Sequence, residues 1–314
     1  MTRATKVKKA RQEAARAKPE ERLPRGLIFL AAAGVAAMVA AGALLLWSSS
    51  RSESEQTFTG VPFEDPGPVH VHGLGIDPAD GALFIATHTG LFRVAEGSRK
   101  AVRVGDRYQD TMGFSVIGPS RFIGSGHPDV RDRDLPPLLG LIESTDAGKT
   151  WTPVSLLGEA DFHVLRSAGR RVYGYDATNG RLLASADGGR EWKELPRPAP
   201  LVDLAPDPGD PQRLVATGEG GLYASRDGGE SWQRLDPIVA LLAWPAPKRL
   251  YLLDGSGAVF VSADGGGNLT RRGEIGGEPA ALLAVEDELY AALHDGTIKR
   301  STDGGATWAV RSSP

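Results

Sequence analysis

Residues 225–232 read SRDGGESW, and the pattern Ser-x-Asp-x-Gly-x-x-Trp in this stretch recurs along the chain. Three further copies are STDAGKTW (144–151), SADGGREW (185–192) and STDGGATW (301–308), and a fifth, SADGGGNL (262–269), lacks the tryptophan. The first serines of the five copies step by 41, 40, 37 and 39 residues. A short motif at a nearly constant interval of this size indicates a repeat fold, in which each interval forms one structural unit.

Each motif follows a segment in which apolar and polar residues alternate, as in GLYASRD (221–227), and another such segment comes after it. The Asp side chain can accept bonds from turn amides, and Gly adopts positive φ at no steric cost. The motif therefore predicts a hairpin turn, and the Trp beside it has the area to pack between neighbouring sheets. The motif residues that we interpret as structural are Ser144, Asp146, Gly148, Trp151, Ser185, Asp187, Gly189, Trp192, Ser225, Asp227, Gly229, Trp232, Ser262, Asp264, Gly266, Ser301, Asp303, Gly305 and Trp308.

Four strands can be assigned to each unit, most clearly at 202–208, 213–218, 221–227 and 231–236. Six units result, since the segment from residue 71, which has no motif, shows the same order of strands. We predict an all-β fold, a six-bladed β-propeller of four-stranded antiparallel blades over residues 67–314, preceded by one N-terminal transmembrane helix. A solenoid is the alternative, although solenoid repeats usually carry fewer strands.

The motifs are similar to the Asp-boxes, or BNR repeats, of sialidases, sortilin-type receptors and Ycf48-like photosystem assembly factors. The resemblance covers most of residues 69–314 and implies the propeller fold, but those families share blades and not activities. Bacterial membrane-anchored proteins of this type are often labelled exo-sialidase or glycosyl hydrolase. A sialidase needs an arginine trio, a Tyr/Glu nucleophilic pair and an acid/base Asp, and the sequence has no Arg-Ile-Pro signature.

The composition excludes several classes of function. The first 25 residues hold nine Lys/Arg against three Glu while the whole chain has a net charge of −3, so the remainder carries about −9. An acidic globule gains no counterion-release energy from nucleic acid, and we expect no nucleic-acid binding. The absence of cysteine rules out disulfides, thiolate zinc sites and a cysteine nucleophile.

The N-terminal part predicts a membrane anchor. Residues 26–47 carry no charge and as a helix would reach about 33 Å, enough for the hydrocarbon core of a bilayer. The basic segment 1–25 would be a cytoplasmic tail, and the polar segment 48–66 a flexible linker. The predicted localisation is the cell membrane, single-pass, with the propeller extracytoplasmic. A cleaved signal peptide is the alternative, against which the length of the apolar run argues.

The unusual polar residues are predicted to share one face of the ring. In such a blade the motif turns lie on one face, while the connections between blades and the turns between second and third strands lie on the other. All six histidines fall at the second face, beside two aspartates and a methionine near the channel. The candidate ligand-binding residues are His70, His72, His88, Asp110, Met112, His127, Asp161, His163 and His294.

Two readings of this group stay open. His70 and His72 would point to the same side of a strand, so a divalent transition metal could bind His70, His72, His88 and His163. Alternatively, the group hydrogen-bonds a polar ligand. The long insertion at 126–140 could fold over the site.

We favour a membrane-tethered binding or assembly module that recognises an extracytoplasmic protein or a small polar or carbohydrate ligand, and not an enzyme. The alternative is a glycosyl hydrolase, exo-sialidase-like, that uses carboxylates of the same face. Its candidate carboxylates are Asp110, Asp161, Asp203, Glu219 and Asp254.

Overall fold

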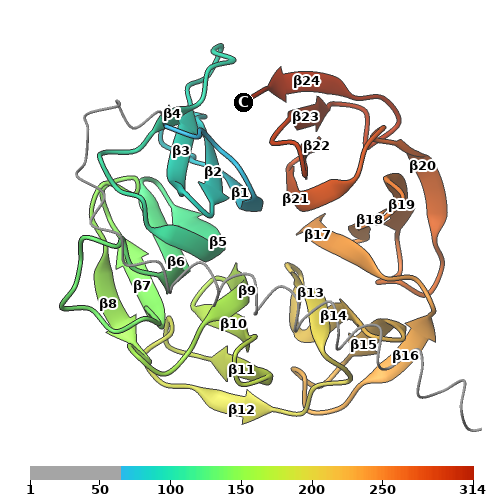
Figure 1. Ribbon diagram of the computed structural model, residues 1–314. Coiled ribbons are helices and arrows are strands. Elements are labelled where there is room, and N and C mark those ends of the chain that lie inside the picture. The colour runs from blue at the N-terminus through green and yellow to red at the C-terminus, as the bar shows by residue number, and fades with distance from the viewer. Residues whose placement is uncertain (1–64) are drawn as a thin grey trace, which may run out of the picture. The chain divides into compact units, whose positions relative to one another are not determined.

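The computed structural model describes residues 65–314. The regular secondary structure of this part consists of strands β1 to β24, arranged in six four-stranded sheets. Within each sheet, consecutive strands pair with one another antiparallel, so every sheet is one of the predicted sequence units. The sheets surround a central channel (Figure 1), and the prediction of a six-bladed propeller is confirmed.

The first three blades lie between residues 71 and 195. Blade one comprises β1 (Val71–Ile76), β2 (Leu83–Thr87), β3 (Gly90–Val94) and β4 (Val102–Arg103). Blade two comprises β5 (Asp110–Gly118), β6 (Arg121–His127), β7 (Leu141–Ser144) and β8 (Thr152–Ser155). Blade three comprises β9 (Phe162–Ala168), β10 (Arg171–Asp176), β11 (Arg181–Ser185) and β12 (Lys193–Leu195).

The last three blades lie between residues 201 and 312. Blade four comprises β13 (Leu201–Asp207), β14 (Asp210–Gly218), β15 (Gly221–Ser225) and β16 (Gln233–Asp236). Blade five comprises β17 (Ala240–Ala246), β18 (Arg249–Asp254), β19 (Ala258–Ser262) and β20 (Thr270–Glu274). Blade six comprises β21 (Pro279–Val285), β22 (Glu288–Leu293), β23 (Ile298–Ser301) and β24 (Ala309–Ser312).

The core is divided into apolar clusters, each shared by two neighbouring blades. Phe84 of blade one packs edge-on against Phe122 of blade two, for example, with 4.7 Å between ring centroids. The ring closes in the same way, because Leu74 and Leu83 of blade one share a cluster with Tyr290 and Ala292 of blade six. This closure excludes the solenoid.

The motif tryptophans belong to these clusters. Trp151, Trp192, Trp232 and Trp308 each pack into the cluster between their own blade and the preceding one. In the fifth copy, Leu269 takes the corresponding place. The predicted packing of tryptophan between sheets is confirmed.

The Ser-x-Asp-x-Gly turns are held by one repeated set of hydrogen bonds. In blade four, Ser225 Oγ accepts a bond from the Gly229 amide at 2.8 Å and lies 2.8 Å from Asp227 Oδ1. Asp227 Oδ1 also accepts a bond from the Ser231 amide. Gly229 has a φ of 97°, and a Cβ there would lie 2.8 Å from Leu195 of blade three. The other four copies repeat the serine bonds.

The two ends of the blades form two faces. In every antiparallel blade the inner strand begins where the second strand ends, as shown by the pairs Val71↔Thr87 and Asp110↔His127. The motifs follow the third strands at the opposite end. We call the first end the histidine face and the second the motif face.

The predicted tail (1–25), the transmembrane anchor (26–47) and residues 48–64 of the linker lie outside the described residues. No helix within residues 65–314 has the length and apolar character needed to cross a membrane. Asp65, placed at the end of the linker by the sequence, accepts a hydrogen bond from Arg103 Nε of blade one at 3.0 Å.

Replacing Ser225 by Ala should lower the free energy of unfolding by about 1–3 kcal/mol, because the buried Gly229 amide would lose its acceptor. Ser313→Ala is the control, since Ser313 is exposed, and it should change stability by less than about 0.5 kcal/mol. Urea denaturation measures both. Equal stability of the two variants would contradict a structural role for the motif serine.

The motif aspartates should make the ring sensitive to acid. Hydrogen bonds from Ser231 lower the pKa of Asp227 from 3.8 to about 2, and bonds led by the Asn268 amide lower the pKa of Asp264 to about 2. The folded state therefore binds these protons less readily than the unfolded chain, and the stabilisation is complete above about pH 4 and lost toward pH 2. Urea midpoints between pH 6 and pH 2 should fall, and fall less steeply in Asp264→Asn. A parallel decline in that variant would be inconsistent with this account.

Candidate functional site

The histidine face is built from three positions that recur from blade to blade. The first position lies just before the inner strand, and the second position lies just after the second strand. The backbone carbonyl of the first accepts a hydrogen bond from the backbone amide of the second, as the amides of His88, Ala177, Glu219 and His294 show. The third position is a register shift near the start of the inner strand, which is found in every blade except blade five. In blade one all three positions carry histidine (His70, His88 and His72), and in blade three the first and third carry Asp161 and His163.

The register shift decides where His72 points. Val71 pairs with Thr87 and Gly73 with Ala86, so His72 is an extra residue in β1, and such a bulge re-aims its side chain. His70 lies before the strand with a φ of 53°. His70 and His72 therefore do not share a regular strand, although both rings lie edge-on to the ring of His88, at 6.2 and 6.3 Å between centroids. His163 occupies the corresponding shift in β9.

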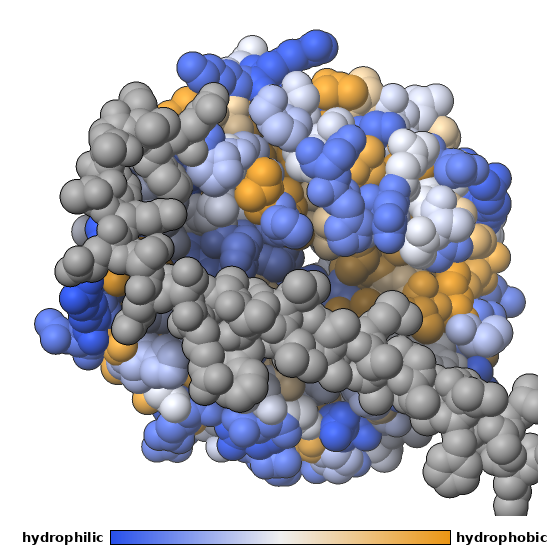
Figure 2. All heavy atoms as spheres, viewed as in Figure 1, coloured by the Kyte–Doolittle hydropathy of each residue, from blue (hydrophilic) through white to orange (hydrophobic). Residues whose placement is uncertain are grey.

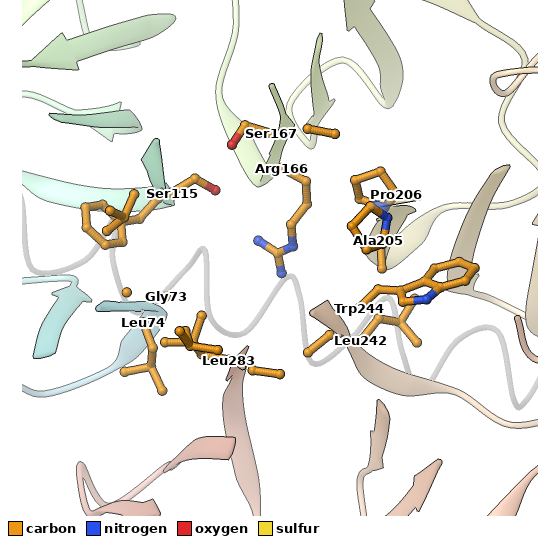
Figure 3. A pocket seen from close by; sticks show the side chains of 18 of the residues that line it. Gly73, Leu74, Ser115, Arg166, Ser167, Ala205, Pro206, Leu242, Trp244 and Leu283 are labelled. Atoms are coloured by element: carbon orange, nitrogen blue, oxygen red, sulfur yellow. The ribbon is translucent and has the colours of Figure 1, made fainter. Parts of the chain in front are cut away.

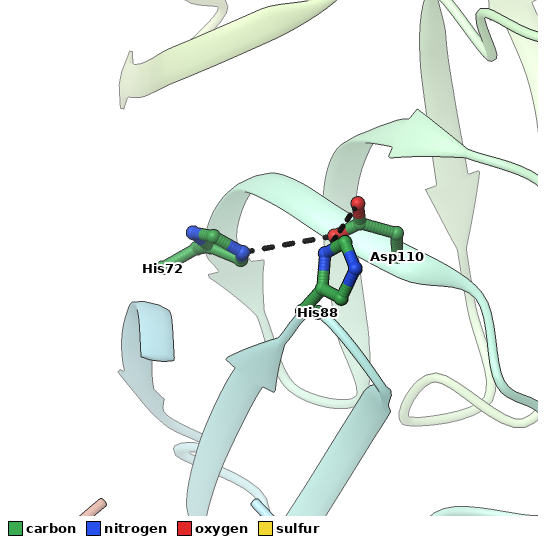
Figure 4. A group of neighbouring side chains, drawn as sticks. All are labelled: His72, His88 and Asp110. Carbon is green, nitrogen blue, oxygen red and sulfur yellow. Dashed lines mark ion pairs between the residues drawn. The ribbon is translucent and has the colours of Figure 1, made fainter. Parts of the chain in front are cut away.

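Asp110 is the centre of the first group of side chains (Figure 4). It begins β5, and its Oδ2 lies 2.9 Å from His88 Nδ1 of blade one and 3.2 Å from His127 Nδ1 of its own blade. Its Oδ1 lies 3.7 Å from His72 Nε2. The Asp110 side chain is 12% exposed and that of His88 61%, so a buried carboxylate meets accessible imidazoles.

A second group repeats this arrangement one blade further on. Asp161 precedes β9 and is 4% exposed, and its Oδ2 lies 2.9 Å from His163 Nε2 and 3.7 Å from His127 Nε2. His127 of blade two thus contacts Asp161 of blade three, just as His88 of blade one contacts Asp110 of blade two. Carboxylates and imidazoles alternate from His72 to His163 across blades one, two and three.

Three atoms of these groups are buried without a hydrogen-bond partner. They are His72 Nε2, Asp110 Oδ1 and Asp161 Oδ1, and among the described residues only Trp244 Nε1 is in the same condition. Burial lowers the pKa of His72, and Asp110 partly opposes this. Since buried polar atoms are almost always paired, these three atoms make the cluster a candidate ligand site.

Three predicted residues, His70, His294 and Met112, are not linked to the cluster by ion pairs, although the ring of His70 lies edge-on to that of His88 with 6.2 Å between centroids. His294 lies 4.0 Å from Glu278 of its own blade and within ion-pair distance of no other carboxylate in residues 65–314. The position of blade one that corresponds to Asp161 of blade three is His70, which is not an acid. Met112 is half-buried in the register shift of β5.

The insertion at 126–140 packs against neighbouring connections. Asp129 accepts a hydrogen bond from the Tyr108 amide at 2.8 Å, and Arg107 pairs with Asp132. On its other side, Leu138 O accepts a bond from the Gly158 amide. These contacts hold the loop to the segments that lead into blades two and three.

The other candidate carboxylates have separate roles. Asp203 is buried and accepts bonds from the Leu204 and Leu242 amides and from Arg166. Asp254 accepts bonds from the Ser256 and Ala258 amides in a turn, and Glu219 is exposed. Of the five, Asp110 and Asp161 alone belong to the histidine cluster.

The central channel contains a cavity of about 700 Å³ lined by the inner strands. Arg166 of β9 reaches into it (Figure 3), where its guanidinium pairs with Asp203 at 2.7 Å. Around the opening, hydrophilic residues gather beside blades one and two and hydrophobic ones beside blade five (Figure 2). Arg166 was not among the residues predicted from sequence, although a charge inside a largely apolar inner strand marks it.

No known family model matches the chain. The dispase autolysis-inducing protein of Streptomyces mobaraensis is 35% identical over 100 residues, which are 31% of this chain and 26% of that protein. The chain thus matches about a quarter of the length of this curated relative.

Solved structures show the same fold. A GH74 enzyme of Niastella koreensis aligns with a TM-score of 0.57 at 16% identity, over 78% of this chain and 45% of that one. An ancestral GH74 enzyme aligns with a TM-score of 0.53 at 12% identity, over 76% and 37% of the two chains. A structure described as YCF48 bound to D1 peptide aligns with a TM-score of 0.44 at 18% identity, over 65% and 69%.

Proposed function

We propose that this chain is a binding or assembly module that receives an extracytoplasmic protein partner on its histidine face. In this proposal residues 26–47 tether it to the cell membrane. The observation that carries the proposal is that three buried polar atoms without partners belong to a cluster that also presents accessible imidazoles, those of His88 and His163. We call the surface at these imidazoles the mouth. A polar group of the partner would supply the missing bonds.

Exposed apolar side chains on connections of the histidine face favour a protein over a small molecule. Val130 and Leu135 of the insertion are 88% and 38% exposed, and Leu157 of the adjoining connection is 37% exposed. The two loops contact each other through the Gly158–Leu138 hydrogen bond. Apolar anchors next to polar groups that lack partners are the usual content of a protein–protein interface.

The curated relative gives this reading limited support, because its name describes an effect on another protein. The competing function is glycoside hydrolysis by Asp110 and Asp161. These two carboxylates flank His127 and each has one oxygen without a partner. The fold likeness to GH74 enzymes is compatible with either function.

A photo-crosslinking amino acid in place of Val130 tests the proposal in cells that make the full chain. We expect irradiation to yield a discrete protein adduct, weakened when Leu135→Asp is added, because a charge there opposes an apolar contact. The matched control carries the same group at Arg226, which is exposed on the motif face. Equal adducts from both positions, or none from Val130, would overturn the proposal.

The hydrolase is tested separately with the purified chain and a panel of glycans. Our proposal predicts no turnover that depends on the two carboxylates. Hydrolysis abolished by either Asp110→Asn or Asp161→Asn would instead establish the enzyme.

A further inference from the structure

Three side chains from separate elements bring ligand atoms together at the mouth. His72 comes from the bulge of β1, His88 from the turn after β2, and Asp110 from the start of β5. Their ligand atoms all lie within 4.8 Å of one another. Two blades therefore contribute to one small space, which the packing of blade one against blade two holds in place.

The distance between His72 and Asp110 is that of two groups that share a cation. His72 Nε2 and Asp110 Oδ1 are 3.7 Å apart, too far for a hydrogen bond, yet both atoms are buried and unpartnered. A metal bound at about 2.1 Å by each of two ligands separates them by roughly 3.0–4.2 Å, depending on the angle at the metal. One ion between them would satisfy both atoms.

The donor types select the class of ion. Two imidazoles and one carboxylate form a ligand set for divalent transition metals, whereas Ca²⁺ and Mg²⁺ require oxygen ligands. We propose that His72, His88 and Asp110 form a binding site for a divalent transition metal ion. The site differs from the set expected from sequence, since Asp110 replaces His70 and His163.

His127 has a positioning role in this site. Its Nδ1 lies 3.2 Å from Asp110 Oδ2, the oxygen that does not face His72. Metal-binding carboxylates are commonly oriented by such outer hydrogen bonds. His127 would also link the ion to Asp161 and so to blade three.

Three protein ligands leave at least one coordination position open. His88 is the exposed member of the set, so this position faces the mouth. The inference deepens the proposed function and rests on it in one respect: a donor atom of the partner would complete the coordination of the ion.

Calorimetric titration of the purified full chain with ZnCl₂, after treatment with a chelator and without a polyhistidine tag, tests the site. We expect about one zinc ion per chain. His72→Ala and Asp110→Asn should each weaken binding by at least about 100-fold, because loss of an outer-sphere partner alone costs about 10–100-fold. Elemental analysis after desalting gives an independent stoichiometry.

His294→Ala and His163→Ala are matched controls on the same face, and both should bind zinc as the wild type does. His88→Ala, which removes an exposed ring, provides a ligand variant that leaves the core untouched. Absence of bound zinc, unchanged affinity in the ligand variants, or loss of zinc in His163→Ala would overturn the metal site. Crosslinking from Val130 with chelator present distinguishes this failure from failure of the proposed function.

Discussion

The structure depends on apolar packing between adjacent blades. Every apolar cluster of residues 65–314 draws side chains from two neighbouring sheets. A single blade on its own would therefore expose its apolar side chains on both faces of its sheet. The ring satisfies this constraint by returning blade six to blade one through Tyr290 and Leu83. The same packing fixes the distances across the histidine face, where contacts such as His88 to Asp110 cross from blade to blade.

Most of the fold could be predicted from sequence because its signals are local and repeated. The motif specifies a turn through bonds within five residues, as between Ser225 and Gly229, and its spacing gives the number of blades. Position within a unit then assigns a residue to a face. His88, His127 and Asp161 were placed together on this basis, and they do lie within one cluster.

The details of the site could not be predicted, because they depend on register and on contacts between blades. A single extra residue turns His72 out of the alternation, and no feature of the local pattern marks it. Asp110 was recognised as polar and near the channel, but its role between two blades depends on which side chain the neighbouring blade presents. His294 illustrates the converse, since within residues 65–314 its one carboxylate at ion-pair distance is Glu278 of its own blade.

Each blade is made of one continuous segment, and blade one takes all four of its strands from residues 71–103. Between blades one and six, in the part of the chain described, only side-chain contacts and bonds such as Ser312 Oγ to Arg99 O join the two ends. The ring is therefore closed between blades one and six without β-ladder pairing between their sheets. Because the chain itself crosses the other five junctions between blades, this one alone within residues 65–314 relies on non-covalent contacts, and its opening would displace the blade that carries His72 and His88.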